Sequence, residues 1–113
     1  MNGFDIENKI VTHNHPSNTP ISLKDFKIFL EGKALEMRAT TFQYTYSISN
    51  PNKVKLNYID VENFWKSMYQ KAKIQAQIKI DKGLILAKDL LIEIQDIQWE
   101  LTSKEFKFVY DRK

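Results

Sequence analysis

The sequence predicts an α+β protein with a small mixed sheet and two longer amphipathic helices beside it. Hydrophobic residues recur at period two in some segments and at i, i+3, i+4 spacing in others. These segments follow the order β-α-β-β-α-α-β, which is not the regular alternation of a parallel α/β sheet. With 113 residues, 42% hydrophobic and 27% charged, the composition is that of one folded domain over residues 1–113.

Local signals define the individual elements. Ser22 begins a helix and Gly32 ends it, because serine caps helix N-termini and glycine favours helix C-termini. The predicted elements are a strand over 7–13, a turn region over 14–20, a helix over 22–32, strands over 35–39 and 42–48, a turn over 50–52, a short extended piece over 54–56, helices over 60–82 and 87–103, and a closing strand over 106–110.

Composition limits the kinds of site that the chain can carry. There is no cysteine, so disulfides and thiolate zinc sites are excluded and any metal must be held by His, Asp or Glu. A net charge of +3 is too small to argue for nucleic-acid binding. No stretch reaches the roughly 20 apolar residues of a membrane helix, and residues 1–5 lack the basic start and apolar run of a signal peptide. We therefore expect a soluble, cytoplasmic protein without membrane contact.

The last predicted helix carries acidic residues at spacings that place them on one face: Asp89, Glu93, Asp96 and Glu100. We favour a solvated face over a metal site or a catalytic base, because charged side chains mostly stay exposed. Lysines of the preceding helix could pair with this face across the two helices or across a subunit boundary: Lys66, Lys71, Lys73, Lys79 and Lys82. Trp65 and Tyr69 on that helix could also hint at nucleic acid, but they lie on its apolar face and are expected in the core.

Trp99 and Ile92 lie seven residues apart, away from the main inward face of the last helix, which includes Leu91. An exposed strip that binds a protein partner or forms a homo-oligomer would explain them. A wider buried face would explain them equally well. Spacing alone does not separate these two interpretations.

The segment with the most chemical content is Thr12-His13-Asn14-His15-Pro16, followed by Ser22 and Asp25. Two histidines at i, i+2 on a strand point to the same side, so both imidazoles can reach one ion. Asp25, in the first turn of the next helix, could add a carboxylate oxygen, giving three ligands and an open position as in catalytic zinc sites. The same Ser22-x-x-Asp25 spacing is also a helix capping box, which needs no metal.

This segment resembles the metal-binding segment of JAB/MPN (JAMM) metalloproteases, which carry His-x-His-Pro, then a serine, then x-x-Asp. The resemblance implies a zinc site with a catalytic serine that stabilises an oxyanion, made of His13, His15, Asp25 and Ser22. The likeness is closer to the C-terminal domain of phage minor head (head morphogenesis) proteins, where a Thr-His-Asn-His-Pro segment with Ser-Leu-x-Asp resembles residues 12–25. The strand pair after the helix and the closing stretch 99–110 also look like that family.

Two departures from the JAMM pattern weaken the expectation of an enzyme. The loop from His15 to Asp25 is one residue shorter than in the proteases, as in the phage-type version. The proteases also place a general-base glutamate on a strand well upstream, and only twelve residues precede His13 here. Glu7 would lie roughly 20 Å from His13 along an extended strand, and a zinc site without a base loses about 10²–10⁴-fold in rate. The chain would then be a fragment of a larger protein or a stand-alone remnant.

The leading hypothesis is a phage- or prophage-type JAB-like domain of the head-morphogenesis kind that binds zinc, with enzyme activity left open. The first alternative is a non-enzymatic interaction or assembly domain that retains the JAB-like frame. A weaker alternative is a nucleic-acid-binding module that uses the lysine-rich helix.

Overall fold

The structure is a computed structural model and describes residues 6–113. Residues 1–5, where the sequence predicts no signal peptide, lie outside the described residues. One four-stranded sheet has the order β1-β2-β3-β4. Its strands are β1 (Ile10–Asn14), β2 (Glu36–Thr40), β3 (Thr45–Ser49) and β4 (Val109–Arg112). The helices are α1 (Leu23–Glu31), α2 (Tyr58–Ser67), α3 (Tyr69–Asp81), the short 3₁₀ turn η1 (Ala87–Asp89) and α4 (Leu90–Phe106).

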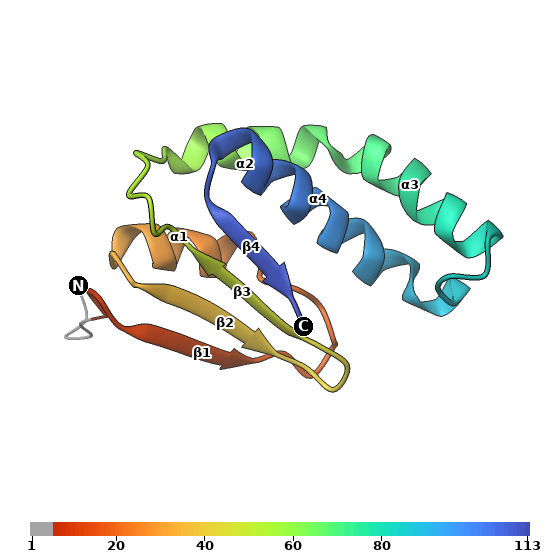
Figure 1. Ribbon diagram of the computed structural model, residues 1–113, viewed down its shortest axis with the longest axis horizontal. Coiled ribbons are helices and arrows are strands. Elements are labelled where there is room, and N and C mark those ends of the chain that lie inside the picture. The colour runs from red at the N-terminus through yellow and green to blue at the C-terminus, as the bar shows by residue number, and fades with distance from the viewer. Residues whose placement is uncertain (1–5) are drawn as a thin grey trace.

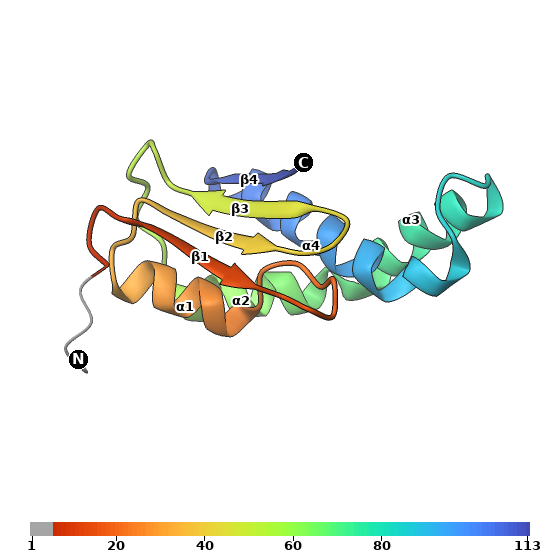
Figure 2. The ribbon, with the colours of Figure 1, turned by 90° about the horizontal axis from the view of Figure 1, so that it is seen from below.

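The sheet is mixed, because β1 runs parallel to β2 while the pairs β2–β3 and β3–β4 are antiparallel. The helices lie on one side of it (Figures 1 and 2). Side chains along β2 and β3 accordingly alternate between buried and more exposed positions, as expected for a sheet with one covered face. The predicted α+β fold class is confirmed.

The parallel pair requires a crossover connection, and α1 provides it. The predicted ends of this helix are confirmed, with Ser22 as the N-cap and Gly32 as the C-cap. Gly32 also allows a close approach, since a Cβ at this position would lie 2.3 Å from Cδ1 of the buried Ile6. The crossover brings the carboxyl end of β1 beside the first turn of α1, where His13 contacts Asp25.

An aromatic cluster joins the sheet to α1 and α4. The ring centroid of Phe26 on α1 lies 5.3 Å from that of Trp99 on α4 and 5.4 Å from that of Phe108. Phe26, Trp99 and Tyr46 of β3 are all fully buried. Trp99 therefore belongs to a wider buried face of α4, which decides between the two interpretations for Trp99, whereas Ile92 is half-buried.

Some strand boundaries differ from the prediction. The first strand begins at Ile10 rather than at residue 7, because the amide of Lys9 donates to the carbonyl of Ile6 and Asn8 takes a φ of 58°, which together form a turn. Phe42, expected in a strand, lies in the turn between β2 and β3 with its side chain 99% exposed. The short extended piece predicted at 54–56 pairs with no strand and forms part of the connection between β3 and α2.

The helix predicted over 60–82 is two helices, α2 and α3. Near the break, Ser67 Oγ donates to the carbonyl of Phe64 at 2.7 Å, and the amide of Met68 is shared between the carbonyls of Phe64 and Trp65. Local side-chain bonds of this kind compete with the regular helical ladder. Tyr69, expected in the core, begins α3 and is 39% exposed.

The last helix and strand also lie later in the chain than predicted. η1 occupies the expected start of the helix, and α4 continues to Phe106. Lys107 then ends the helix with a left-handed φ of 62°, so the closing strand begins at Val109. Two helix residues expected to point inward, Ala87 and Leu91, are exposed.

The prediction of a solvated acidic face on the last helix is wrong for Glu93 and Asp96, whereas Glu100 is exposed as predicted. Glu93 is 3% exposed and Asp96 is fully buried. Glu93 accepts hydrogen bonds from Lys79 Nζ at 2.6 Å and Arg112 Nη1 at 2.9 Å, and Asp96 accepts one from the Tyr110 hydroxyl at 2.6 Å. The predicted pairing of a lysine with this face across two helices is confirmed for Lys79. The spacing within α4 could not reveal the burial, because Tyr110 and Arg112 come from β4.

The two buried carboxylates respond to burial in opposite ways. Burial raises the pKa of Asp96 to about 6, against the hydrogen bond from Tyr110 and the charge of Arg112. Arg112 Nη1 lies 3.2 Å from Asp96 Oδ2 but makes no hydrogen bond to it. Burial also opposes ionisation of Glu93, but the hydrogen bonds from Lys79 and Arg112 outweigh it and hold the pKa of Glu93 below its usual range.

α3 and α4 form a helical pair that extends beyond the sheet (Figures 1 and 2). Small side chains let the helices approach, since Ala72 and Ala76 pack against Ile94 and Ile97. Large apolar side chains along α3 and around the connection between the helices stay exposed: Ile74, Ile78, Leu84, Leu86 and Leu91. None of the helices within residues 6–113 combines the length and the apolar composition needed to cross a bilayer.

Candidate metal centre

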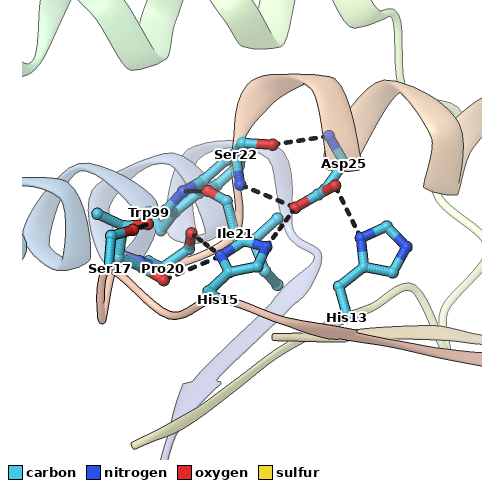
Figure 3. A network of polar contacts seen from close by, with 9 residues as sticks. His13, His15, Ser17, Pro20, Ile21, Ser22, Asp25 and Trp99 are labelled. Atoms are coloured by element: carbon cyan, nitrogen blue, oxygen red, sulfur yellow. Dashed lines mark hydrogen bonds and ion pairs between the residues drawn. The ribbon is translucent and has the colours of Figure 1, made fainter. Parts of the chain in front are cut away.

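The structure brings His13, His15 and Asp25 together at the carboxyl end of β1 (Figure 3). His13 lies on β1, and the amide of His15 extends the pairing with β2 by donating to the carbonyl of Thr40 at 2.9 Å. Because residues two apart on an extended chain face the same way, both imidazoles turn toward α1. Asp25 faces them from the first turn of that helix.

The Asp25 carboxylate lies between the two imidazole rings. Its Oδ1 is 3.0 Å from His13 Nδ1, and its Oδ2 is 3.0 Å from His15 Nε2. One ligand atom from each of the three residues lies within 4.8 Å of the others. The site is partly shielded, with side-chain exposures of 36% for His13, 15% for His15 and 10% for Asp25. The three residues could hold a metal ion.

The orientation of the His15 ring is fixed by contacts of the nitrogen that does not face Asp25. Its Nδ1 lies 3.1 Å from the carbonyl oxygens of both Thr19 and Pro20. Carbonyl oxygens only accept hydrogen bonds, so Nδ1 carries a proton and donates. Its Nε2 faces a carboxylate oxygen, which in the ionised form is also only an acceptor. Nε2 is therefore the ring nitrogen that His15 presents to Asp25.

Ser22 and Asp25 also form the capping box that the spacing predicts. Asp25 N donates to Ser22 Oγ at 3.0 Å, and Ser22 N donates to Asp25 Oδ2 at 3.4 Å. The capping box and the metal-ligand arrangement are compatible, because the box orients the same carboxylate that faces the histidines. The Ser22 hydroxyl accepts from the helix, so its proton is available to donate. A catalytic role for Ser22 stays a prediction.

Residues that the sequence did not connect with this site hold the loop between His15 and Ser22. Trp99 Nε1 donates to the carbonyl of Ile21 at 2.6 Å, across 78 residues of sequence (Figure 3). Asn18 Oδ1 accepts from the amide of Phe42, which ties the same loop to the turn between β2 and β3. Nothing in the spacing of the sequence pairs Trp99 with this loop, because the contact depends on how α4 packs.

The other acidic residues considered from the sequence do not join this cluster. Within residues 6–113, His13, His15 and Asp25 are the one group of three or more His, Asp or Glu side chains close enough to share an ion. Glu7 lines a cleft with Leu35 and Leu56, near the opposite end of β1. Glu93 and Asp96 are bound by residues of α3 and β4.

Comparisons with protein-family models, with curated proteins and with solved structures found no match to this chain. The assignment of a function consequently rests on the site itself and on the resemblance of its residues.

Proposed function

We propose that this protein binds one zinc ion through His13, His15 and Asp25, and that it is a JAB-like domain of the phage head-morphogenesis kind. The observation that carries the proposal is the fixed orientation of His15, whose Nδ1 donates to backbone carbonyls while its Nε2 faces Asp25. Histidine metal ligands usually have this arrangement, in which the far ring nitrogen donates to a carbonyl and presents the near one to the ion.

The donor set and its dimensions fit zinc. Two imidazoles and a carboxylate are ligands that zinc accepts, and cysteine is absent from the chain. Zinc bonds of 2.0–2.1 Å to nitrogen and oxygen in a tetrahedron separate the ligand atoms by about 3.3 Å. The two nitrogen–oxygen separations at Asp25 are both 3.0 Å but involve different carboxylate oxygens, and the ligand atoms of the three residues lie within 4.8 Å of one another, so the side chains would have to close around the ion. A bound zinc ion would supply Lewis acidity at its open position.

The proposal concerns metal binding and does not extend to efficient hydrolysis. Proton transfer by a general base contributes about 10²–10⁴-fold to such reactions. Within residues 6–113, no further carboxylate shares the cluster of His13, His15 and Asp25. The Ser22 hydroxyl can donate a hydrogen bond toward a developing negative charge, as the family resemblance implies, but it does not replace a base.

Variants at the ligand positions test the proposal. Purified protein should bind one zinc ion per chain by calorimetric titration, and His15→Ala should weaken binding by at least the ten- to hundredfold expected even for loss of a supporting residue. Asn14→Ala is the matched control, because Asn14 lies between the two histidines on the exposed side of β1. Equal zinc affinity in His15→Ala, Asn14→Ala and the wild type would refute the site.

A second candidate function is an interaction or assembly domain. It is favoured by the exposed apolar side chains of the α3–α4 pair, which projects past the sheet. Exposed apolar patches of this kind mark association surfaces. If this candidate is correct, Leu84→Ser with Leu86→Ser should abolish self-association or partner binding, while His15→Ala should leave it unchanged. Sedimentation measurements of these variants would separate the two functions, since zinc binding depends on His15 and not on Leu84.

A further inference from the structure

A cleft lies away from the His13 cluster, where the connection between β3 and α2 approaches the end of α1. Its volume is about 450 Å³, within the range of small-molecule sites. Apolar side chains form much of its wall: Phe29, Leu30, Ala34, Leu35, Val54 and Leu56. Leu35 is 55% exposed, so an apolar surface is accessible from solvent in this cleft.

Two lysines stand at the rim of this cleft, Lys33 after α1 and Lys53 in the connection to α2. Both are exposed, and within residues 6–113 neither side chain forms an ion pair with an acidic residue. Glu7 also lines the cleft, and among the described residues two positive charges against one negative leave the rim cationic. The cleft therefore combines apolar walls with a cationic rim.

Both lysines occupy backbone positions that suit glycine better. Lys33 has a φ of 53° directly after the cap of α1, and Lys53 has a φ of 50° at the last position of the turn that begins at Asn50. Glycine is preferred at both kinds of position, because a left-handed conformation is costly for residues with a Cβ. Asn8, with a φ of 58°, lines the same cleft. Three of the five non-glycine residues with positive φ in residues 6–113 thus surround it.

The rim is held in place by hydrogen bonds. Asn50 accepts from the amide of Val54 at 3.1 Å and donates to its carbonyl at 2.8 Å, which closes the turn that carries Lys53. The amide of Asn8 donates to the carbonyl of Lys33 at 3.0 Å. The two lysines are consequently presented from a fixed backbone, and backbone strain kept in a fixed rim is characteristic of ligand sites.

We propose that this cleft binds a small apolar anion, of the class of medium-chain carboxylates, with its chain against Leu35 and Leu56 and its carboxylate between Lys33 and Lys53. The apolar walls account for the chain and the unpaired lysines for the charge. The cleft is separate from His13, His15 and Asp25, so ligand binding in the cleft can be tested independently of zinc binding.

Octanoate is a suitable probe. Octanol is a control that keeps the apolar chain without the charge, and acetate is a control that keeps the charge without the chain. In ¹H–¹⁵N spectra of the whole chain, octanoate should produce saturable shifts at the amides of Leu35, Val54 and Leu56. Octanol should bind more weakly and acetate should not saturate. Lys33→Gln and Lys53→Gln should each weaken octanoate binding about two- to fivefold, the range for a partly exposed charge pair, and should leave octanol unaffected.

Glycine variants separate a binding role from a structural one. Lys53→Gly should raise the Tm by a few degrees, because glycine adopts positive φ without the steric cost, and should weaken octanoate binding. Lys107 is the matched control: its φ is 62°, but it lies at the end of α4 and does not line the cleft. Lys107→Gly should therefore stabilise the protein and leave octanoate binding unchanged. Absence of saturable shifts at the cleft, shifts centred on the α3–α4 tip, or equal binding of octanoate and octanol would each overturn the proposal.

Discussion

Replacing Asp96 by asparagine removes one buried negative charge while keeping the size of the side chain. The Tyr110 hydroxyl can still donate to the remaining side-chain oxygen, and Arg112 keeps its hydrogen bond to Glu93. The substitution also removes the ion pair between Asp96 Oδ2 and Arg112 Nη1, so the part of the difference that changes with pH reports the ionisation of the buried carboxyl group. We expect Asp96→Asn to stabilise the protein at neutral pH.

The magnitude follows from the pKa. Burial raises the pKa of Asp96 to about 6 in the folded protein, whereas an unfolded aspartate ionises with its ordinary value of 3.8. The folded state therefore binds the proton more tightly, and the free energy of unfolding falls as the pH rises between these two values. Two pKa units correspond to about 3 kcal/mol, which is the largest gain expected from asparagine once Asp96 is fully ionised.

Urea unfolding of both proteins across the acid range measures this effect. The gain from Asp96→Asn should be small near about pH 4, grow up to about pH 6 and then level off. Taking the difference at each pH cancels the contributions of groups that do not interact with Asp96. Glu93 is not among them, because its charge raises the pKa of Asp96. A gain that did not change with pH, or a loss of stability at neutral pH, would show that Arg112 already compensates the charge and would refute the reasoning.

Two further substitutions test packing contacts that hold the fold and the site. Gly32→Ala should destabilise the protein by about 1 kcal/mol or more, because its Cβ would lie 2.3 Å from Ile6 Cδ1 and displace a buried side chain. In urea unfolding, this loss should largely vanish when Ile6 is also replaced by alanine. Gly83→Ala is the control: it has nothing within 4 Å but a φ of 72°, so it should cost the same with Ile6 or with alanine at position 6. Trp99→Phe leaves the Ile21 carbonyl without its donor, at a cost of about 1–3 kcal/mol, and adds a cavity cost because phenylalanine is smaller than the fully buried tryptophan. Calorimetry should also show weaker zinc binding, and unchanged zinc affinity would mean that the loop does not need this contact.

The parts of the fold that local signals determine could be predicted from the sequence. The cap at Ser22, the end of α1 at Gly32 and the alternation of buried side chains within β2 and β3 depend on neighbouring residues, and the structure has them as predicted, except that Leu35 and Phe42 lie outside the strands and are exposed. The clustering of His13 and His15 with Asp25 also followed from strand and helix geometry. These features involve contacts between residues close in the chain.

The features that sequence reasoning missed depend on long-range packing. The acidic residues of α4 were expected in solvent, but β4 returns from the end of the chain and places Arg112 and Tyr110 against Glu93 and Asp96. The same packing brings Trp99 to the loop that holds His15. Since no spacing within a helix encodes which strand will cover it, neither contact could be inferred from α4 alone.

X-ray absorption at the zinc edge of the loaded protein tests the central claim most directly. If His13, His15 and Asp25 bind the metal, one zinc ion per chain should show nitrogen and oxygen ligands at about 2.0–2.1 Å with the scattering pattern of two imidazoles. His13→Ala should reduce that pattern to one imidazole or eliminate binding. A protein that retains no zinc, or whose zinc has a ligand shell unchanged by His13→Ala, would contradict the account.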